Sequence, residues 1–264
     1  MEKIEMNISN KKENLKESKG LENVIEILKN EAEKLNQLGI PVDEECRLKI
    51  EKFNNYPKEK IFYDKVREDR FKEKFNYEDR NKSLGEKFEK LKTALFQKYL
   101  AEEFIVCRTS FFDDVLNGVD NIILDKETGN IVCALDEVCD IHSKRYEDKR
   151  KKVLDVNKMG GAEIEYGFKF DVKDKKISLT KLSNVPLFLL GLNENYVNNC
   201  LKHFGSNDKF NRDILTFFIQ SLKQQADLLI NTCPKNSEIS KNIANFQKVL
   251  NKLIGHYNLQ TNRK

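Results

Sequence analysis

Two aspartates, Asp120 and Asp136, stand in neighbouring apolar stretches whose pattern predicts two antiparallel strands. If the strands pair so that Asp125 faces Ile131, Asp120 lies directly opposite Asp136 on one face of the hairpin. A register shifted by one residue would separate them. Two like charges about 5 Å apart destabilise a sheet unless a positive partner offsets them. We therefore expect a divalent cation at this pair, and the carboxylate oxygens suit Mg²⁺ or Mn²⁺.

The order of these acids along the chain resembles the PD-(D/E)XK nuclease superfamily, over about residues 83–192. That family has an acid on a helix, an Asp on a following strand and an Asp/Glu-x-Lys motif at the end of the next strand. Asp120 in GVDNIIL matches the first strand acid, and Asp136 in CALDEV matches the second. The resemblance implies a restriction-endonuclease-like core.

The same resemblance implies a metal ligand on the preceding helix, which is predicted to end near Glu102 and Glu103. Glu103 is the expected ligand beside Asp120 and Asp136, and Glu102 is the alternative because sequence does not fix the end of a helix so finely.

The lysine of the family motif is missing, because Val138 stands two residues after Asp136. A lysine from the next predicted helix could take its place. Lys144, Lys149 and Lys152 are the candidates, and Lys144, the closest in sequence, is the expected catalytic lysine.

The resemblance thus implies metal-assisted hydrolysis of phosphodiester bonds in DNA or RNA. Arg108 and Ser110 of the preceding strand are expected to contact the phosphate. Three residues of the basic helix are expected to follow the nucleic-acid backbone: Arg145, Lys149 and Lys152. Two alternatives stay open: a non-enzymatic protein-interaction module whose acids are structural, and a nucleic-acid-binding protein whose site has lost its activity.

Hydrophobic periodicity predicts the elements that must position these residues. Ser83 and Glu86 form a capping-box pattern at the start of a helix that runs to about residue 103. Strands are predicted near 104–110, 120–124 and 131–138, then a basic helix over 143–158, and then three further strands that end in VPLFLLGL.

These elements predict an α/β (α+β) fold, with a central mixed sheet and flanking helices, in three regions. A helical N-terminal region covers 1–82, with one helix over Leu21–Leu38 and a second over Val42–Phe53. The α/β core covers 83–192, and a helical C-terminal region packed on it covers 193–264.

Charge and composition bear on partners and location. The formal net charge is only +4, but the stretch from His142 to Lys158 has seven basic and three acidic residues. Such a stretch favours nucleic acid as a partner, and the helical extensions offer surfaces for a protein partner. The polar start, the lack of a long apolar run and the absence of Cys-x-x-Cys pairs predict a cytoplasmic protein that does not enter a membrane.

Overall fold

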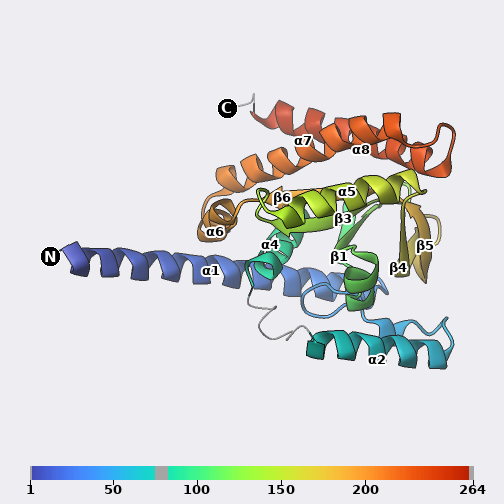
Figure 1. Ribbon diagram of the computed structural model, residues 1–264, viewed down its shortest axis with the longest axis horizontal. Helices are drawn as coiled ribbons and strands as arrows, with labels where there is room; N and C mark the ends of the chain where they lie inside the picture. Colours follow the sequence, from blue (N-terminus) through green and yellow to red (C-terminus); the bar gives the residue numbers. More distant parts are fainter. Residues whose placement is uncertain (1, 75–82, 262–264) are drawn as a thin grey trace.

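The computed structural model describes residues 2–74 and 83–261, so residues 75–82 of the predicted N-terminal region lie outside the described residues (Figure 1). The described helices are α1 (Glu2–Gln37), α2 (Lys58–Lys74), α4 (Leu84–Leu100), α5 (Lys144–Lys158), α6 (Glu194–His203), α7 (Asp208–Thr232) and α8 (Glu238–Thr261). The strands are β1 (Phe104–Arg108), β2 (Asn121–Asp125), β3 (Ile131–Cys139), β4 (Ala162–Asp171), β5 (Lys176–Val185) and β6 (Leu187–Leu192).

A four-stranded mixed sheet in the order β1-β2-β3-β6 forms the centre of the fold. The first three strands are antiparallel to their neighbours, whereas β6 runs parallel to β3. The chain between β3 and β6 forms α5 and then a separate hairpin of β4 and β5. The sheet and its flanking helices confirm the mixed α/β class expected from the sequence.

The register of β2 and β3 next to the acids is the expected one, and its first pair lies between Asp120 and Asp136. Asn121 pairs with Leu135, and the N–H of Asp120 donates to the carbonyl oxygen of Leu135 at 2.8 Å. The register expected at the turn is wrong, because an irregularity after Ile123 shifts the pairing there by one residue. The extra residue lies between the acids and the turn, so it leaves the register next to the acids unchanged.

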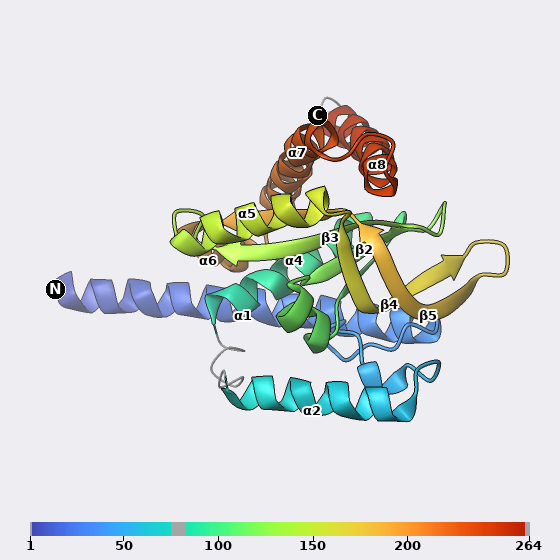
Figure 2. The same ribbon diagram turned by 45° about the vertical axis from the view of Figure 1, so that its right-hand side comes forward.

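Helices α4 and α5 cover opposite faces of β3 (Figures 1 and 2). Neighbouring residues of a strand point to opposite faces. Asp136 forms an ion pair with Lys149 of α5, and Glu137 forms one with Lys92 of α4. A lysine from one helix on each face of the sheet therefore contacts the two acids at the end of β3.

Helix α4 begins as its capping pattern predicts, because the Oγ of Ser83 accepts a hydrogen bond from the N–H of Glu86 at 3.2 Å. The helix is buried on nearly all sides, with α1 packed against it. Its buried residues include charged side chains as well as the expected apolar ones: Glu86, Glu89, Lys90 and Lys92. These charges must find partners inside the protein.

The second helix expected over Val42–Phe53 is wrong. Val42 bridges Leu48, and the N–H of Leu48 donates to the carbonyl oxygen of Arg108 at the edge of β1, at 3.1 Å. Only Ile50–Lys52 form a short 3₁₀ helix. Pairing with the open edge of β1 supplies hydrogen bonds for this backbone and overrides the helical periodicity of its apolar residues.

The C-terminal helices α7 and α8 lie side by side against β6 and β3 (Figure 2). Phe188 of β6 packs against Phe246 of α8, with tilted rings whose centroids lie 4.8 Å apart. One hydrophobic core draws residues from all three regions that the sequence predicts. None of the helices in the described ranges has both the length and the apolar character that crossing a membrane requires.

Candidate metal centre

Asp120 is held in place just before β2 by hydrogen bonds to β3. Besides the bond from its N–H to Leu135, its Oδ2 accepts from the N–H of Glu137 at 2.7 Å. The chain reaches this point from a π-type turn, Asp113–Asn117, through Gly118 in the left-handed conformation (φ 61°). Asp120 is only 4% exposed, so water offsets little of its charge.

Asp136, 1% exposed, faces helix α5. Lys149 forms an ion pair with its Oδ1 and also donates to the carbonyl oxygen of Glu137. One turn further along α5, the ammonium of Lys152 lies over Gly118, so close that a Cβ there would overlap it. Two lysines of α5 therefore border the hairpin end that bears Asp120 and Asp136.

Glu137 points to the opposite face, where it meets Lys92. Both side chains are buried and form an ion pair. Within the described residues, neither carboxylate oxygen of Glu137 has a hydrogen-bond partner, and the same is true of Oδ2 of Asp136. Oε1 of Glu137 is the atom that contacts Lys92, so Oε2 of Glu137 and Oδ2 of Asp136 are the oxygens available to a cation or a proton.

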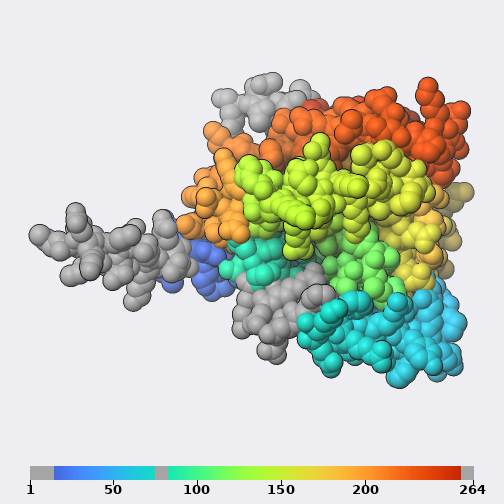
Figure 3. Space-filling model, viewed as in Figure 1, coloured from blue at the N-terminus to red at the C-terminus, as the bar shows by residue number. Residues whose placement is uncertain are grey.

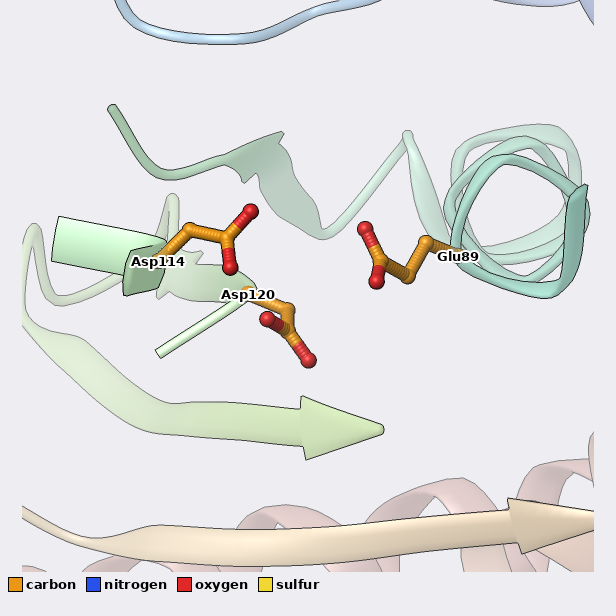
Figure 4. Close-up of side chains that lie close together, drawn as sticks. All are labelled: Glu89, Asp114 and Asp120. Atoms are coloured by element: carbon orange, nitrogen blue, oxygen red, sulfur yellow. The ribbon is translucent and has the colours of Figure 1, made fainter. Parts of the chain in front are cut away.

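Glu89 and Asp114 complete the acidic cluster. One carboxylate oxygen from each of Glu89, Asp114 and Asp120 lies within 4.8 Å of the other two. Figure 4 shows Glu89 reaching from α4 and Asp114 from the π-type turn, with the two carboxylates pointing toward one another and Asp120 beside them. Acids from a helix, a turn and the start of a strand thus converge.

Two arginines lie among these acids. Arg108, 0% exposed, donates to Glu86 at 2.5 Å and to Glu89 at 2.9 Å. Arg47 donates to Asp114 at 3.1 Å, and its Nη2 lies 3.8 Å from Oε2 of Glu89. Part of the negative charge is thus already offset by the protein itself.

Carboxylates nevertheless outnumber cations in the cluster that these contacts define. The carboxylates are Glu45, Glu86, Glu89, Asp114, Asp120, Asp136 and Glu137, and the cations are Arg47, Lys90, Lys92, Arg108 and Lys149. Among the described residues, these contacts thus involve seven carboxylates and five cations, so the carboxylates are in excess. A divalent cation or protons on the acids would offset this excess.

The pKa values divide the acids into two kinds. Burial, together with the charges of Asp120 and Asp114, raises the pKa of Glu89 to about 8. Burial and the charge of Asp120 raise the pKa of Asp136 to about 7. Burial alone would also raise the pKa of Asp120, but Lys149 and the hydrogen bonds from Glu137 outweigh it and lower that pKa below its ordinary value. Asp120 is therefore the ionised member near neutral pH.

These residues fit a hard divalent cation. Carboxylate oxygens within 4.8 Å of one another can share one ion, and oxygen ligands are those that Mg²⁺ and Mn²⁺ prefer. The unpartnered oxygens of Asp136 and Glu137 offer further ligand positions. Glu89, Asp114 and Asp120 are accordingly the residues that would share it, and Asp136 and Glu137 lie next to Asp120.

Two of the residues expected at the site lie elsewhere. Glu103 precedes Phe104, which pairs with Asp125 at the far end of β2, roughly 15 Å along the strand from Asp120. Lys144 is an exposed residue of the first turn of α5, and Lys149 makes the contact with Asp136 instead. The structure thus places Glu89 and Lys149 where the sequence suggested Glu103 and Lys144.

The expected phosphate-binding residues also separate into two groups. Arg108 is fully buried among glutamates, and the hydroxyl of Ser110 donates to Oδ2 of Asp113 at 2.7 Å inside the protein, so neither is presented to a ligand at the surface. Arg145 and Lys152 are exposed on α5, one turn on either side of Lys149.

The sequence analysis did not identify Glu89, Lys92 or Arg47 as members of the cluster. On α4, Glu89 and Lys92 follow the same spacing as an ordinary solvent-facing stripe, so spacing alone carries no sign that they are buried. Arg47 comes from a segment far away in sequence, and only the pairing of that segment with β1 brings it here.

Comparison of the chain with models of protein families, with curated proteins and with solved structures found no match.

Proposed function

We propose that the protein is a metal-dependent, nuclease-like hydrolase of phosphodiester bonds with a PD-(D/E)XK-type core. The observation that carries the proposal is the meeting of Asp120, Asp136 and Lys149 at one end of the β2–β3 hairpin. Helix α4, three antiparallel strands and helix α5 follow one another in the order expected from the resemblance, which supports the proposal further.

Each residue has a role that its surroundings support. Asp120 and Asp136 would hold Mg²⁺ or Mn²⁺, with Glu89 and Glu137 beside them. The bound ion would polarise a phosphate oxygen and activate the attacking water. Burial alone would lower the pKa of Lys149, but the charges of Asp120 and Asp136 raise it above its ordinary value. Lys149 is therefore an ammonium that orients the water and offsets negative charge, rather than a base.

The basic face of α5 gives the site a surface for nucleic acid. Arg145 and Lys152 are exposed on either side of Lys149. In Figure 3 the green segment around residue 115 reaches the surface between α5, yellow-green, and α2, cyan. A phosphate backbone that follows α5 would pass over the residues bordering Asp120.

A second function, nucleic-acid binding without cleavage, is favoured by one specific observation. The site acids are buried, and Lys149, Lys92, Arg47 and Arg108 already contact them. Cations that already offset the charge of the acids stabilise the site without a metal, as expected of a site that has lost its activity.

A cleavage assay separates the two functions. Plasmid DNA and RNA would be incubated with the protein and Mg²⁺, Mn²⁺ or EDTA, beside a double Asp120→Asn/Asp136→Asn variant. The matched control is Asp148→Asn/Asp155→Asn, which removes the same charge from exposed positions of α5. Metal-dependent cleavage that only the first variant loses supports the nuclease. Binding without cleavage supports the second function. The absence of both binding and cleavage supports the protein-interaction module.

A further inference from the structure

Arg47 reaches the acidic cluster from outside the predicted core, on a short segment that pairs with β1. The N–H of Arg108 donates to the carbonyl oxygen of Cys46 at 2.9 Å, and the N–H of Leu48 donates back to Arg108. Asp43 closes the loop, because its Oδ1 accepts from the N–H of Arg47 at 2.9 Å. The backbone is thus anchored on both sides of Arg47, and its side chain enters the protein.

The guanidinium of Arg47 bridges two of the three acids that form the candidate cation cluster. Its Nη1 lies 3.1 Å from Oδ2 of Asp114, and its Nη2 lies 3.8 Å from Oε2 of Glu89. With the side chain only 7% exposed, no solvent layer separates these charges. A positive group thus already stands between acids that a divalent cation would share.

Arg47 is held less completely than its neighbour Arg108. Its Nη1 also donates to the carbonyl oxygen of Thr109 at 3.4 Å, but its Nε and Nη2 have no hydrogen-bond partner within the described residues. Arg108, in contrast, donates to three glutamates at 2.5 to 3.1 Å. Displacing Arg47 breaks fewer hydrogen bonds than displacing Arg108, so Arg47 is the cation that can leave.

We infer that Arg47 is an internal competitor for the divalent metal: its guanidinium occupies the cation position at Asp114 and Glu89, and metal binding displaces it. The inference rests on the proposed metal site. The buried Oε2 of Glu137 and Oδ2 of Asp136 mark the same cluster independently, since neither has a hydrogen-bond donor among the described residues even with Arg47 in place. Metal loading is then coupled to movement of the Arg47 side chain, and the affinity for metal is lower than the acids alone would give.

The test is a calorimetric titration of the full-length chain with Mn²⁺. Arg47→Met keeps the length and apolar stem but removes the competing charge. Lys90→Met is the control, because it removes one charge from the same network at a position paired with Glu45 and Glu86. Arg47→Lys is the second variant, in case Arg47→Met does not fold, because one ammonium cannot bridge Asp114 and Glu89 as a guanidinium does.

We expect Arg47→Met to bind Mn²⁺ at least ~10-fold more tightly than the wild type, Arg47→Lys to show a smaller gain and Lys90→Met to show little change. A gain in the Arg47 variants when the wild type itself binds no Mn²⁺ also supports the inference. Wild-type binding that neither Arg47 variant strengthens overturns the inference and leaves the proposed nuclease intact. No Mn²⁺ binding by any variant, with no cleavage in the nuclease assay, overturns both.

Discussion

Lys149 of α5 and Asp136 of β3 form an ion pair at the hairpin end where Asp120 also lies. Asp136 is almost completely buried, so its ionised form depends on this ammonium. The pair thus joins the helix that presents basic residues to the surface with the strand that bears the acids.

Replacing Lys149 with Met is expected to reduce phosphodiester cleavage by about 100-fold or more, since the ammonium that offsets developing charge is lost. Initial rates on plasmid DNA would measure the effect. Lys144→Met, on the same helix but exposed, is the matched control and should cleave at the wild-type rate. Equal losses in the two variants would contradict the role given to Lys149.

Arg108 is expected to act on stability rather than on nucleic-acid binding. Replacing it with Met leaves Glu86 and Glu89 buried without their closest cation, which should lower the free energy of unfolding by about 3–5 kcal/mol. Urea unfolding measures this quantity, with the exposed Arg145→Met as the control, for which a change within about 0.5 kcal/mol is expected. An Arg108→Met protein as stable as the wild type would show that the buried pairs contribute little.

Arg145 should contribute to nucleic-acid affinity through the phosphate backbone alone. Arg145→Ala is expected to weaken binding similarly for all sequences and to reduce the slope of log affinity against log salt by about 1. Fluorescence anisotropy at several salt concentrations would measure both. The exposed Arg67 of α2 is a matched site for a control variant, Arg67→Ala. A sequence-dependent loss, or an unchanged salt slope, would exclude the expected backbone contact.

The raised pKa values predict how stability depends on pH without metal. Glu89 (pKa about 8) and Asp136 (pKa about 7) keep protons in the folded state that the unfolded chain loses near pH 4. The folded state therefore binds more protons between about pH 4 and 8, and the free energy of unfolding should fall as pH rises through this window. Each proton contributes a slope of up to ~1.4 kcal/mol per pH unit.

Urea unfolding in EDTA at pH 5 to 8 would measure this slope. Glu89→Gln, which carries no titrating carboxyl, should flatten it, whereas Asp155→Asn, at an exposed position, should not. Stability that rises steadily across this range would mean that the cluster is already balanced when all its acids are ionised.

Local patterns predicted much of the fold because they depend on neighbours in the sequence. Ser83 caps α4 as its pattern indicates, and apolar alternation located β2 and β3 closely enough to give the register next to Asp120 and Asp136. The sequence did not predict the bulge after Ile123, because an extra residue between strand and turn leaves the alternation of apolar and polar residues nearly unchanged.

The rest of the site depended on contacts that the sequence does not encode locally. Glu89 lies more than three helical turns before Glu103, and only the packing of α4 against the sheet decides which acid faces Asp120. Likewise, the orientation of α5 about its own axis decides that Lys149, rather than Lys144, contacts Asp136. Arg47 reaches the cluster only because its segment pairs with residues more than 60 positions later in the sequence. Periodicity gives the faces of a helix, but it does not say how the helix is turned against a sheet.

The most direct test of the metal centre is the anomalous scattering of Mn²⁺ in crystals of the full-length chain. We predict one strong peak bound by the carboxylates of Asp120 and Asp136, which disappears in crystals of the Asp120→Asn/Asp136→Asn variant. The absence of a peak at saturating Mn²⁺, or a peak that persists in the variant, would contradict the central claim that these two aspartates hold a catalytic cation.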